Sequence, residues 1–233
     1  MMRRAAPPLA ELHAGAFAIL PAALAACPFG LMLGQQAVAK GLTPMDVLAM
    51  SSIVFAGSAQ FVAIGLWESP PPLLVLACTV LLINLRHVLM GASIAGRIRP
   101  FGPLRFVAVH LMADEIWAVA ERRALSQPLT PAFWFGAGLL LFFCWQVSTV
   151  LGAVLGATIQ DPARYGLDFA FPAMFLGLAL SFWKGWRTGP VVAAAGITAV
   201  LAHAALPGGW HVPAGALAGI ATAVVLGPEK ARR

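Results

Sequence analysis

The sequence predicts an all-α integral membrane protein: a polytopic helical bundle with six to eight hydrophobic segments, some of them broken or re-entrant. Of the 233 residues, 60% are hydrophobic and 10% are charged, whereas a soluble domain carries about 25% charged residues. The apolar residues also gather in long runs, and a spanning helix needs roughly 20 such residues. We therefore expect one membrane-embedded domain over residues 1–233, with short cytoplasmic tails at 1–13 and 228–233.

Proline, glycine and charged residues divide the chain into eight apolar runs. These are Ala14–Ala39, Pro44–Trp67, Leu73–Ile94, Phe106–Ala120, Ala132–Ala157, Phe169–Trp183, Val191–Leu206 and Pro213–Leu226. The second run is polar in its middle, and the fourth is short and contains charged residues. Irregular backbone and polar side chains at membrane depth are tolerated only against protein or water. These two runs are therefore expected to be broken or re-entrant and to line a substrate path.

The distribution of lysine and arginine predicts the orientation, because cytoplasmic loops carry an excess of both. If all eight runs cross, nine of the fourteen lysines and arginines other than Arg86 lie on the side of the two termini. If the second and fourth runs re-enter, Arg97, Arg99 and Arg105 join that side, and the count becomes twelve. Both counts place the termini in the cytoplasm, and the second favours six crossings with two re-entrant elements.

The net charge of +6 is explained by this loop bias. The sequence shows no basic patch interleaved with aromatic residues, so nucleic acid is not expected as a partner. The three cysteines, Cys27, Cys78 and Cys144, each lie in an apolar run without metal-ligand spacing. They are interpreted as small buried hydrophobic residues, and neither a metal nor a cofactor is expected.

Polar residues cluster in the middle of the second run. They are Ser51, Ser52, Gly57, Ser58 and Gln60. One interpretation is close helix–helix packing, in which each interhelical hydrogen bond contributes roughly 0.6 kcal/mol. The other is an unwound segment, hinged at Gly57, whose freed amides and hydroxyls bind a carboxylate.

The third and fourth runs contain titratable residues. Arg86, which follows Asn84, either snorkels to the cytoplasmic interface, holds a substrate carboxylate, or pairs with Asp114 or Glu115. His110 and Asp114 are four residues apart and are expected to share one helix face. A carboxylate beside a histidine in an apolar run suits a proton relay; the alternative is an amphipathic interfacial helix whose acidic residues face water.

Two further features have simpler interpretations. Asp168, before Pro172, is expected to cap a helix N-terminus. His203, paired with Ser58, would suit an intramembrane serine hydrolase, but that chemistry needs a defined nucleophile–base pair. The residues around Ser58 lack the second glycine that rhomboid-type proteases show after their serine, so His203 is interpreted as a core histidine.

Taken together, these motifs resemble the AzlC family, the large subunit of bacterial branched-chain amino-acid exporters. The resemblance covers roughly Gly15 to Leu226. It rests on Cys-Pro-Phe-Gly at 27–30, Val-Phe-Ala-Gly-Ser-Ala-Gln-Phe at 54–61, Asn-Leu-Arg-His at 84–87, Asp-Glu at 114–115 and Leu-Asp-Phe-Ala-Phe-Pro at 167–172.

The resemblance implies a secondary transporter of the bacterial cytoplasmic (inner) membrane that exports valine, leucine and isoleucine, and in some members methionine. It also implies a small hydrophobic partner subunit of the AzlD type and energy from the proton motive force. A passive channel for a small neutral solute and an assembly subunit without its own path are the alternatives. Asp114 and Glu115 argue against the channel, because a passive pore needs no protonatable residue.

An amino-acid zwitterion needs a carboxylate binder, an ammonium acceptor and an apolar pocket. The polar residues of the second run, with Arg86, are the candidates for the carboxylate. Asp114 or Glu115 would accept the ammonium or the coupling proton. The pocket would be lined by phenylalanines, namely Phe29, Phe55 and Phe61.

Overall fold

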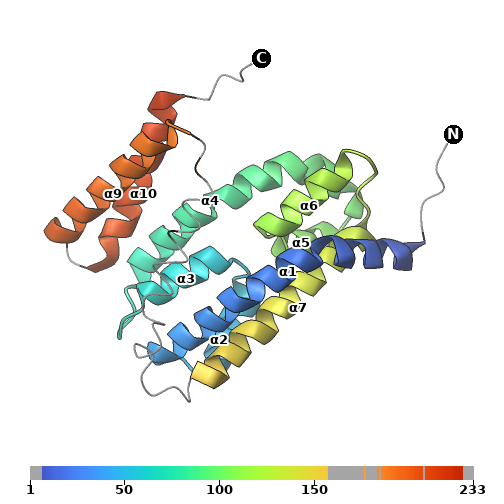
Figure 1. Cartoon of the computed structure of the whole chain (residues 1–233), viewed down its shortest axis with the longest axis horizontal. Helices are drawn as coiled ribbons and strands as arrows, with labels where there is room; N and C mark the ends of the chain where they lie inside the picture. The colour runs from blue at the N-terminus through green and yellow to red at the C-terminus, as the bar shows by residue number, and fades with distance from the viewer. Residues whose placement is uncertain (1–6, 157–175, 177–182, 184, 207, 228–233) are drawn as a thin grey trace. The chain divides into compact units, whose positions relative to one another are not determined.

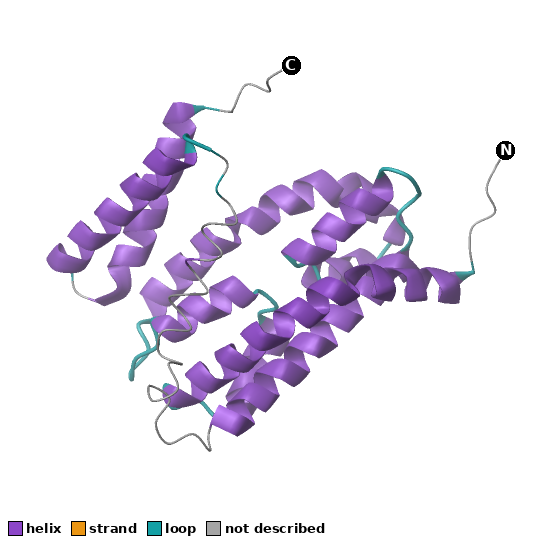
Figure 2. Cartoon of the chain, viewed as in Figure 1, coloured by secondary structure: helices purple, strands orange, loops and turns teal. Residues whose placement is uncertain are grey.

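The computed structural model describes residues 7–156, 176, 183, 185–206 and 208–227. All regular structure in these residues is helical (Figure 2). The α-helices are α1 (Pro8–Ala39), α2 (Pro44–Ile53), α3 (Gly57–Gly65), α4 (Leu73–Ile98), α5 (Leu104–His110), α6 (Asp114–Ala124), α7 (Pro131–Gly156), α9 (Thr188–Ala205) and α10 (His211–Leu226). Short 3-10 turns lie at Arg99–Phe101 and Gly208–Trp210. Asp168, Pro172 and nearly all of the sixth apolar run lie outside the described residues.

Four helices of the described chain are long and apolar enough to cross a membrane: α1, α4 with its following 3-10 turn, α7 and α9. The shorter α10 is also apolar. Large hydrophobic side chains are exposed along these helices, for example Phe17, Leu89 and Phe143. Lipid is the solvent that such surfaces need, so the expected all-helical integral membrane fold is confirmed.

The chain divides into two compact units. One comprises Met1–Ile64 and Asn84–Gln160, and the other comprises Gly65–Ile83 and Asp161–Arg233. In the second unit, α9 packs on α10 through small residues, with Gly215 and Gly219 of α10 against Ala195 of α9. The first unit contains the polar residues on which the functional interpretation depends.

Glycines bring α1 and α7 into close parallel contact. A Cβ atom on Gly15 would clash with the backbone of Phe133, and one on Gly34 would clash with the backbone of Thr149. Since these contacts advance along both helices in the same direction, α1 and α7 begin at one end of the unit and finish at the other. We call these the N-terminal end and the opposite end.

The second and fourth apolar runs are broken helices, as expected. In the second, α2 ends at Ile53 and α3 begins at Gly57; in the fourth, α5 ends at His110 and α6 begins at Asp114. A capping box starts α2, in which Thr43 and Asp46 each satisfy a backbone amide of the other.

The hairpin α5–α6 enters from the N-terminal end and returns to it. Near the end of α6, Glu121 pairs with Arg97 at the end of α4, and Arg123 pairs with Glu11 in the first turn of α1. The connection between α5 and α6 lies deeper, because a Cβ atom on Gly138 of α7 would contact Leu111.

The hairpin α2–α3 enters from the opposite end, where α1 finishes (Figure 1). Its turn lies at the middle of α7, where a Cβ atom on Gly57 would contact the Trp145 ring. From there α3 leads to Leu73, the start of α4, and α4 finishes at the N-terminal end. The two hairpins therefore enter the bundle from opposite ends.

Candidate functional site

Arg86 lies where the turns of the two hairpins meet. Its Nη2 donates to Ser58 Oγ at 2.6 Å, in the first turn of α3. Its Nη1 lies 2.5 Å from Asp114 Oδ2, at the first residue of α6. The guanidinium thus joins both hairpins to the middle of α4, and of the alternatives for Arg86 the structure shows the pairing with Asp114.

The N-termini of α3 and α6 both begin beside this guanidinium. The first backbone N–H groups of a helix have no intrahelical partner, and the helix dipole places partial positive charge there. In α3 these amides belong to the residues around Gly57, since Gln60 N is the one that bonds back to Ala56 O. The arrangement suits a bound carboxylate.

A buried hydrogen-bond chain fixes the α2–α3 hairpin. Gln60 Nε2 donates to Ser51 Oγ at 2.9 Å, and Trp145 Nε1 donates to Gln60 Oε1 at 3.0 Å. All three side chains are buried. Ser51 and Gln60 thus connect α2 to α3 and to α7. This is the helix-packing role, one of the two interpretations that the sequence allowed for these residues.

His110 lies apart from Asp114 and contacts the other hairpin. Its Nε2 is 3.1 Å from the carbonyl oxygen of Ser52, in the last turn of α2. The expected shared helix face of His110 and Asp114 is wrong, because the helix is interrupted at Leu111–Ala113. His110 instead contacts the carbonyl oxygen of Ser52, which has no intrahelical partner because it lies at the end of α2.

The three phenylalanines expected to line the pocket differ in burial and position. The Phe55 ring lies 5.2 Å from that of Phe142, and the His110 ring lies 6.5 Å from Phe142. Phe55 and Phe61 are buried, whereas Phe29 is 41% exposed on α1. Phe55 lies within the interruption between α2 and α3, and Phe29 lies on the surface of α1.

Unused hydrogen-bonding capacity surrounds Arg86. Asn84 Oδ1 and Arg86 Nε are buried and have no hydrogen-bond partner among the described residues. Buried polar atoms normally have partners, so these two atoms are candidates for contacts with a ligand. Glu115, the remaining titratable candidate, is exposed next to Asp114.

Several interacting residues at the N-terminal end were not predicted from the sequence. Glu11 accepts two bonds from Arg123 Nη2, at 2.7 and 2.9 Å, and one from Thr130 Oγ1 at 3.0 Å.

In the described part of the chain, no group of three or more histidine, cysteine, aspartate or glutamate side chains could hold a metal ion.

The comparisons with known proteins agree on one family. The family model described as "AzlC protein" matches residues 21–159, more than half of the chain. The inner membrane protein YgaZ of Escherichia coli K12 is 27% identical over 92% of this chain and 89% of its own length. The branched-chain amino acid transport protein AzlC of Bacillus subtilis is 27% identical over 66% of this chain and 61% of its own length.

An uncharacterized membrane protein of Archaeoglobus fulgidus is 30% identical over 71% of this chain and 73% of its own length. No solved structure matches. The matched region of the family model includes both broken helices, Arg86 and α7. By sequence, the chain belongs to the AzlC family of membrane proteins.

Proposed function

We propose that this chain is the large subunit of a secondary-active exporter of branched-chain amino acids, driven by the proton motive force. The observation that carries the proposal is the position of Arg86, which bonds Ser58 in one broken helix and Asp114 in the other. Broken helices whose N-termini face a shared charged site are typical of secondary transporters. The B. subtilis relative is named as a branched-chain amino acid transport protein.

The substrate carboxylate would bind at Arg86 and at the first amides of α3. Asp114 already occupies Arg86 Nη1 with a carboxylate oxygen at 2.5 Å. Asp114 is 41% exposed at its side chain, so an arriving carboxylate can compete for the same nitrogen. In this proposal Asp114 stands in for the substrate until the substrate replaces it.

The substrate ammonium would bind to Asp114, once released from Arg86, and to Asn84 Oδ1. Both are oxygen acceptors, and Asn84 Oδ1 is buried without a partner among the described residues. Asp114 or the neighbouring Glu115 is also the proposed carrier of the coupling proton. A passive channel for a neutral solute would need neither carboxylate.

The aliphatic side chain would lie against Phe55, whose ring packs on Phe142. Apolar pockets discriminate weakly between side chains that differ by one methylene, by roughly 10- to 200-fold. Valine, leucine and isoleucine are therefore the expected substrates, with methionine as a further one.

The Ser58 contact gives no support to the serine hydrolase alternative, which assigned the base to His203. Ser58 Oγ accepts from the Arg86 guanidinium, a group that stays protonated and has no acceptor atom. Arg86 therefore offers no base for activating this hydroxyl.

The proposed orientation has the N-terminal end in the cytoplasm. Five arginines lie at that end of the described first unit, namely Arg97, Arg99, Arg105, Arg122 and Arg123, against Lys40 at the opposite end. Cytoplasmic loops are rich in such residues. We also propose a small hydrophobic partner subunit of the AzlD type, as the resemblance described in the sequence implies.

Efflux from preloaded cells that lack their own exporters tests the function. The chain is expressed with and without its neighbouring small membrane protein, and valine, leucine, isoleucine and methionine are followed with and without a protonophore. Protonophore-sensitive efflux that needs both chains is expected. If none of the four amino acids leaves the cells although both chains are in the membrane, the substrate assignment is wrong.

The double substitution Asp114→Asn with Glu115→Gln then tests the proton carriers, with the exposed Glu68→Gln as a matched control. We expect proton-coupled efflux to be lost in the double variant and kept in the control. Intact coupling in the double variant would remove both carboxylates from the proton path.

A further inference from the structure

We propose that the polar seam between α4 and α6 is a hydrated path from the N-terminal end of the bundle to Arg86. The polar seam consists of Arg86, Ser93 and Arg97 of α4 and Asp114, Trp117 and Glu121 of α6. The inference that an amino acid moves along this path rests on the proposed function. The inference that the path contains water is independent of that function.

The seam follows from residue spacing and from contacts. On α4 its members lie at positions i, i+7 and i+11, and on α6 at i, i+3 and i+7, so each set occupies one helix face. Between the ion pairs at its two ends, Trp117 Nε1 donates to Ser93 Oγ at 2.7 Å, and Ser93 Oγ lies 3.1 Å from Glu121 Oε1. Arg97 pairs with Glu121.

The seam is long enough to connect the site with one membrane surface. Arg97 is eleven residues beyond Arg86, roughly 16 Å along a helix that rises 1.5 Å per residue. Half of a hydrocarbon core of about 30 Å is about 15 Å. Polar groups therefore line α4 from the middle of the bundle to its N-terminal end.

Burial and charge favour water as the occupant of this path. The Arg97 and Glu121 side chains remain 39% and 25% exposed, and a charge facing lipid costs about 3 kcal/mol. Other exposed residues of α4, such as Val88 and Leu89, are apolar. The polar face therefore needs an aqueous surrounding that the rest of α4 does not.

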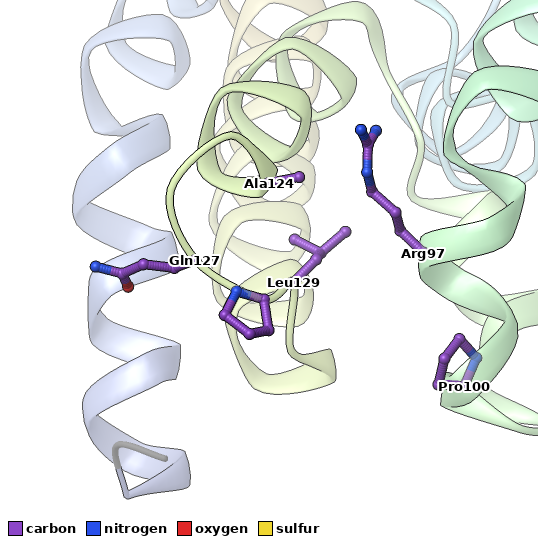
Figure 3. A pocket seen from close by; sticks show the side chains of 6 residues that line it. Arg97, Pro100, Ala124, Gln127 and Leu129 are labelled. Atoms are coloured by element: carbon purple, nitrogen blue, oxygen red, sulfur yellow. The ribbon is translucent and has the colours of Figure 1, made fainter. Parts of the chain in front are cut away.

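An open pocket lies at the outer end of the seam. It has a volume of about 310 Å³ and is lined by Arg97, Pro100, Ala124, Gln127, Pro128 and Leu129. Figure 3 shows Arg97 reaching from α4 toward Ala124 and Leu129. Because Arg97 belongs both to this pocket and to the seam, we place the entrance of the path at this pocket.

Cysteine accessibility tests the path. In a variant with Cys27, Cys78 and Cys144 replaced by alanine, single cysteines are introduced by Ser93→Cys and Ala124→Cys. Each is treated in inside-out and right-side-out vesicles with a membrane-impermeant cationic methanethiosulfonate, which reacts with thiolates in water. The matched control is Ala95→Cys, which is exposed on α4 at nearly the depth of Ser93 but about 200° around the helix at 100° per residue.

We expect the Ser93 and Ala124 variants to react from the side of the N-terminal end, at least ten times faster than the Ala95 variant. Labelling after denaturation confirms that every variant carries its thiol. No reaction at Ser93, or equal reaction at Ser93 and Ala95, overturns the path. Reaction at Ser93 only when the small subunit is absent also overturns it, because the seam would then be a subunit interface.

Efflux measured alongside separates this inference from the proposed function. Efflux without labelling of the Ser93 variant keeps the exporter and rejects the hydrated seam. Labelling of that variant, with no efflux of any of the four amino acids from cells expressing the chain with native residues, keeps the seam and rejects the exporter.

Discussion

Replacing Arg86 separates its two structural roles. The guanidinium holds Ser58 through Nη2 and Asp114 through Nη1, so each nitrogen serves a different broken helix. Lysine keeps the positive charge but presents one nitrogen on a flexible stem. Arg86→Lys is therefore expected to keep the ion pair and to lose the simultaneous hold on Ser58, whereas Arg86→Gln loses the charge as well.

The magnitude follows from the contacts. A hydrogen bond that involves a charged group contributes about 1.5–3 kcal/mol, and 1.4 kcal/mol corresponds to a factor of ten in affinity. The Arg86 and Asp114 side chains are 31% and 41% exposed, so solvent screening favours the low end of this range. We expect roughly a tenfold weaker substrate affinity for Arg86→Lys and about a hundredfold for Arg86→Gln.

Two assays measure the effect: the apparent KM for leucine efflux in proteoliposomes, and leucine binding to the purified protein. Arg99→Gln, at an exposed arginine, is the matched control and should leave both values unchanged. If Arg86→Lys binds leucine as tightly as the unaltered chain, substrate binding does not require simultaneous contacts of residue 86 with Ser58 and Asp114. If Arg86→Gln binds leucine normally, Arg86 is not the carboxylate ligand.

Three further predictions concern the stability of the protein in detergent. Gly34→Ala should lower the melting temperature, because its Cβ would clash with backbone atoms of α7, whereas Gly96→Ala, which has open space, should not. Gln60→Leu leaves the Trp145 indole N–H and a hydroxyl without a buried partner, which costs about 1–3 kcal/mol for each, so a lower melting temperature is expected; an unchanged one would contradict the network. Hydrogen bonds from the Thr43 hydroxyl and backbone lower the pKa of Asp46 from its ordinary value of 3.8. This cap therefore stabilises the protein near neutral pH, and its contribution is lost as the pH falls through that lowered pKa. Asp46→Asn should lower the melting temperature at pH 7, and the difference from the unaltered chain should shrink as the pH is lowered below 3.8.

Hydrophobic runs predicted the helices well, because lipid requires both length and apolarity. Their boundaries were less predictable where charged residues form pairs. The first helix begins at Pro8 and includes Glu11, because that carboxylate bonds Arg123 from another helix. Likewise α6 extends past Ala120, since its last turns hold Glu121 and Arg123 in ion pairs.

The sequence predicted which residues form the candidate site better than it predicted which of them contact one another. Gly57 and its polar neighbours indicated the first break, and Asp114 was one of the partners considered for Arg86. The partner of His110 was not predictable, because spacing by four assumes a continuous helix and the helix is interrupted there. Ser93 could have been found, since its spacing from Arg86 and Arg97 places all three on one face.

The two hairpins enter from opposite ends, and one guanidinium holds both of them. A substrate carboxylate that takes the place of Asp114 at Nη1 would release the start of α6 while the Nη2 bond still holds α3. Substrate binding would then loosen the α5–α6 hairpin selectively. That hairpin remains tied at its far end by Arg97–Glu121 and Arg123–Glu11, so opening the N-terminal end requires these pairs to break as well. A planar side chain with two separate donor nitrogens can make this distinction between the hairpins, and a lysine at the same position would present all its N–H donors on a single nitrogen.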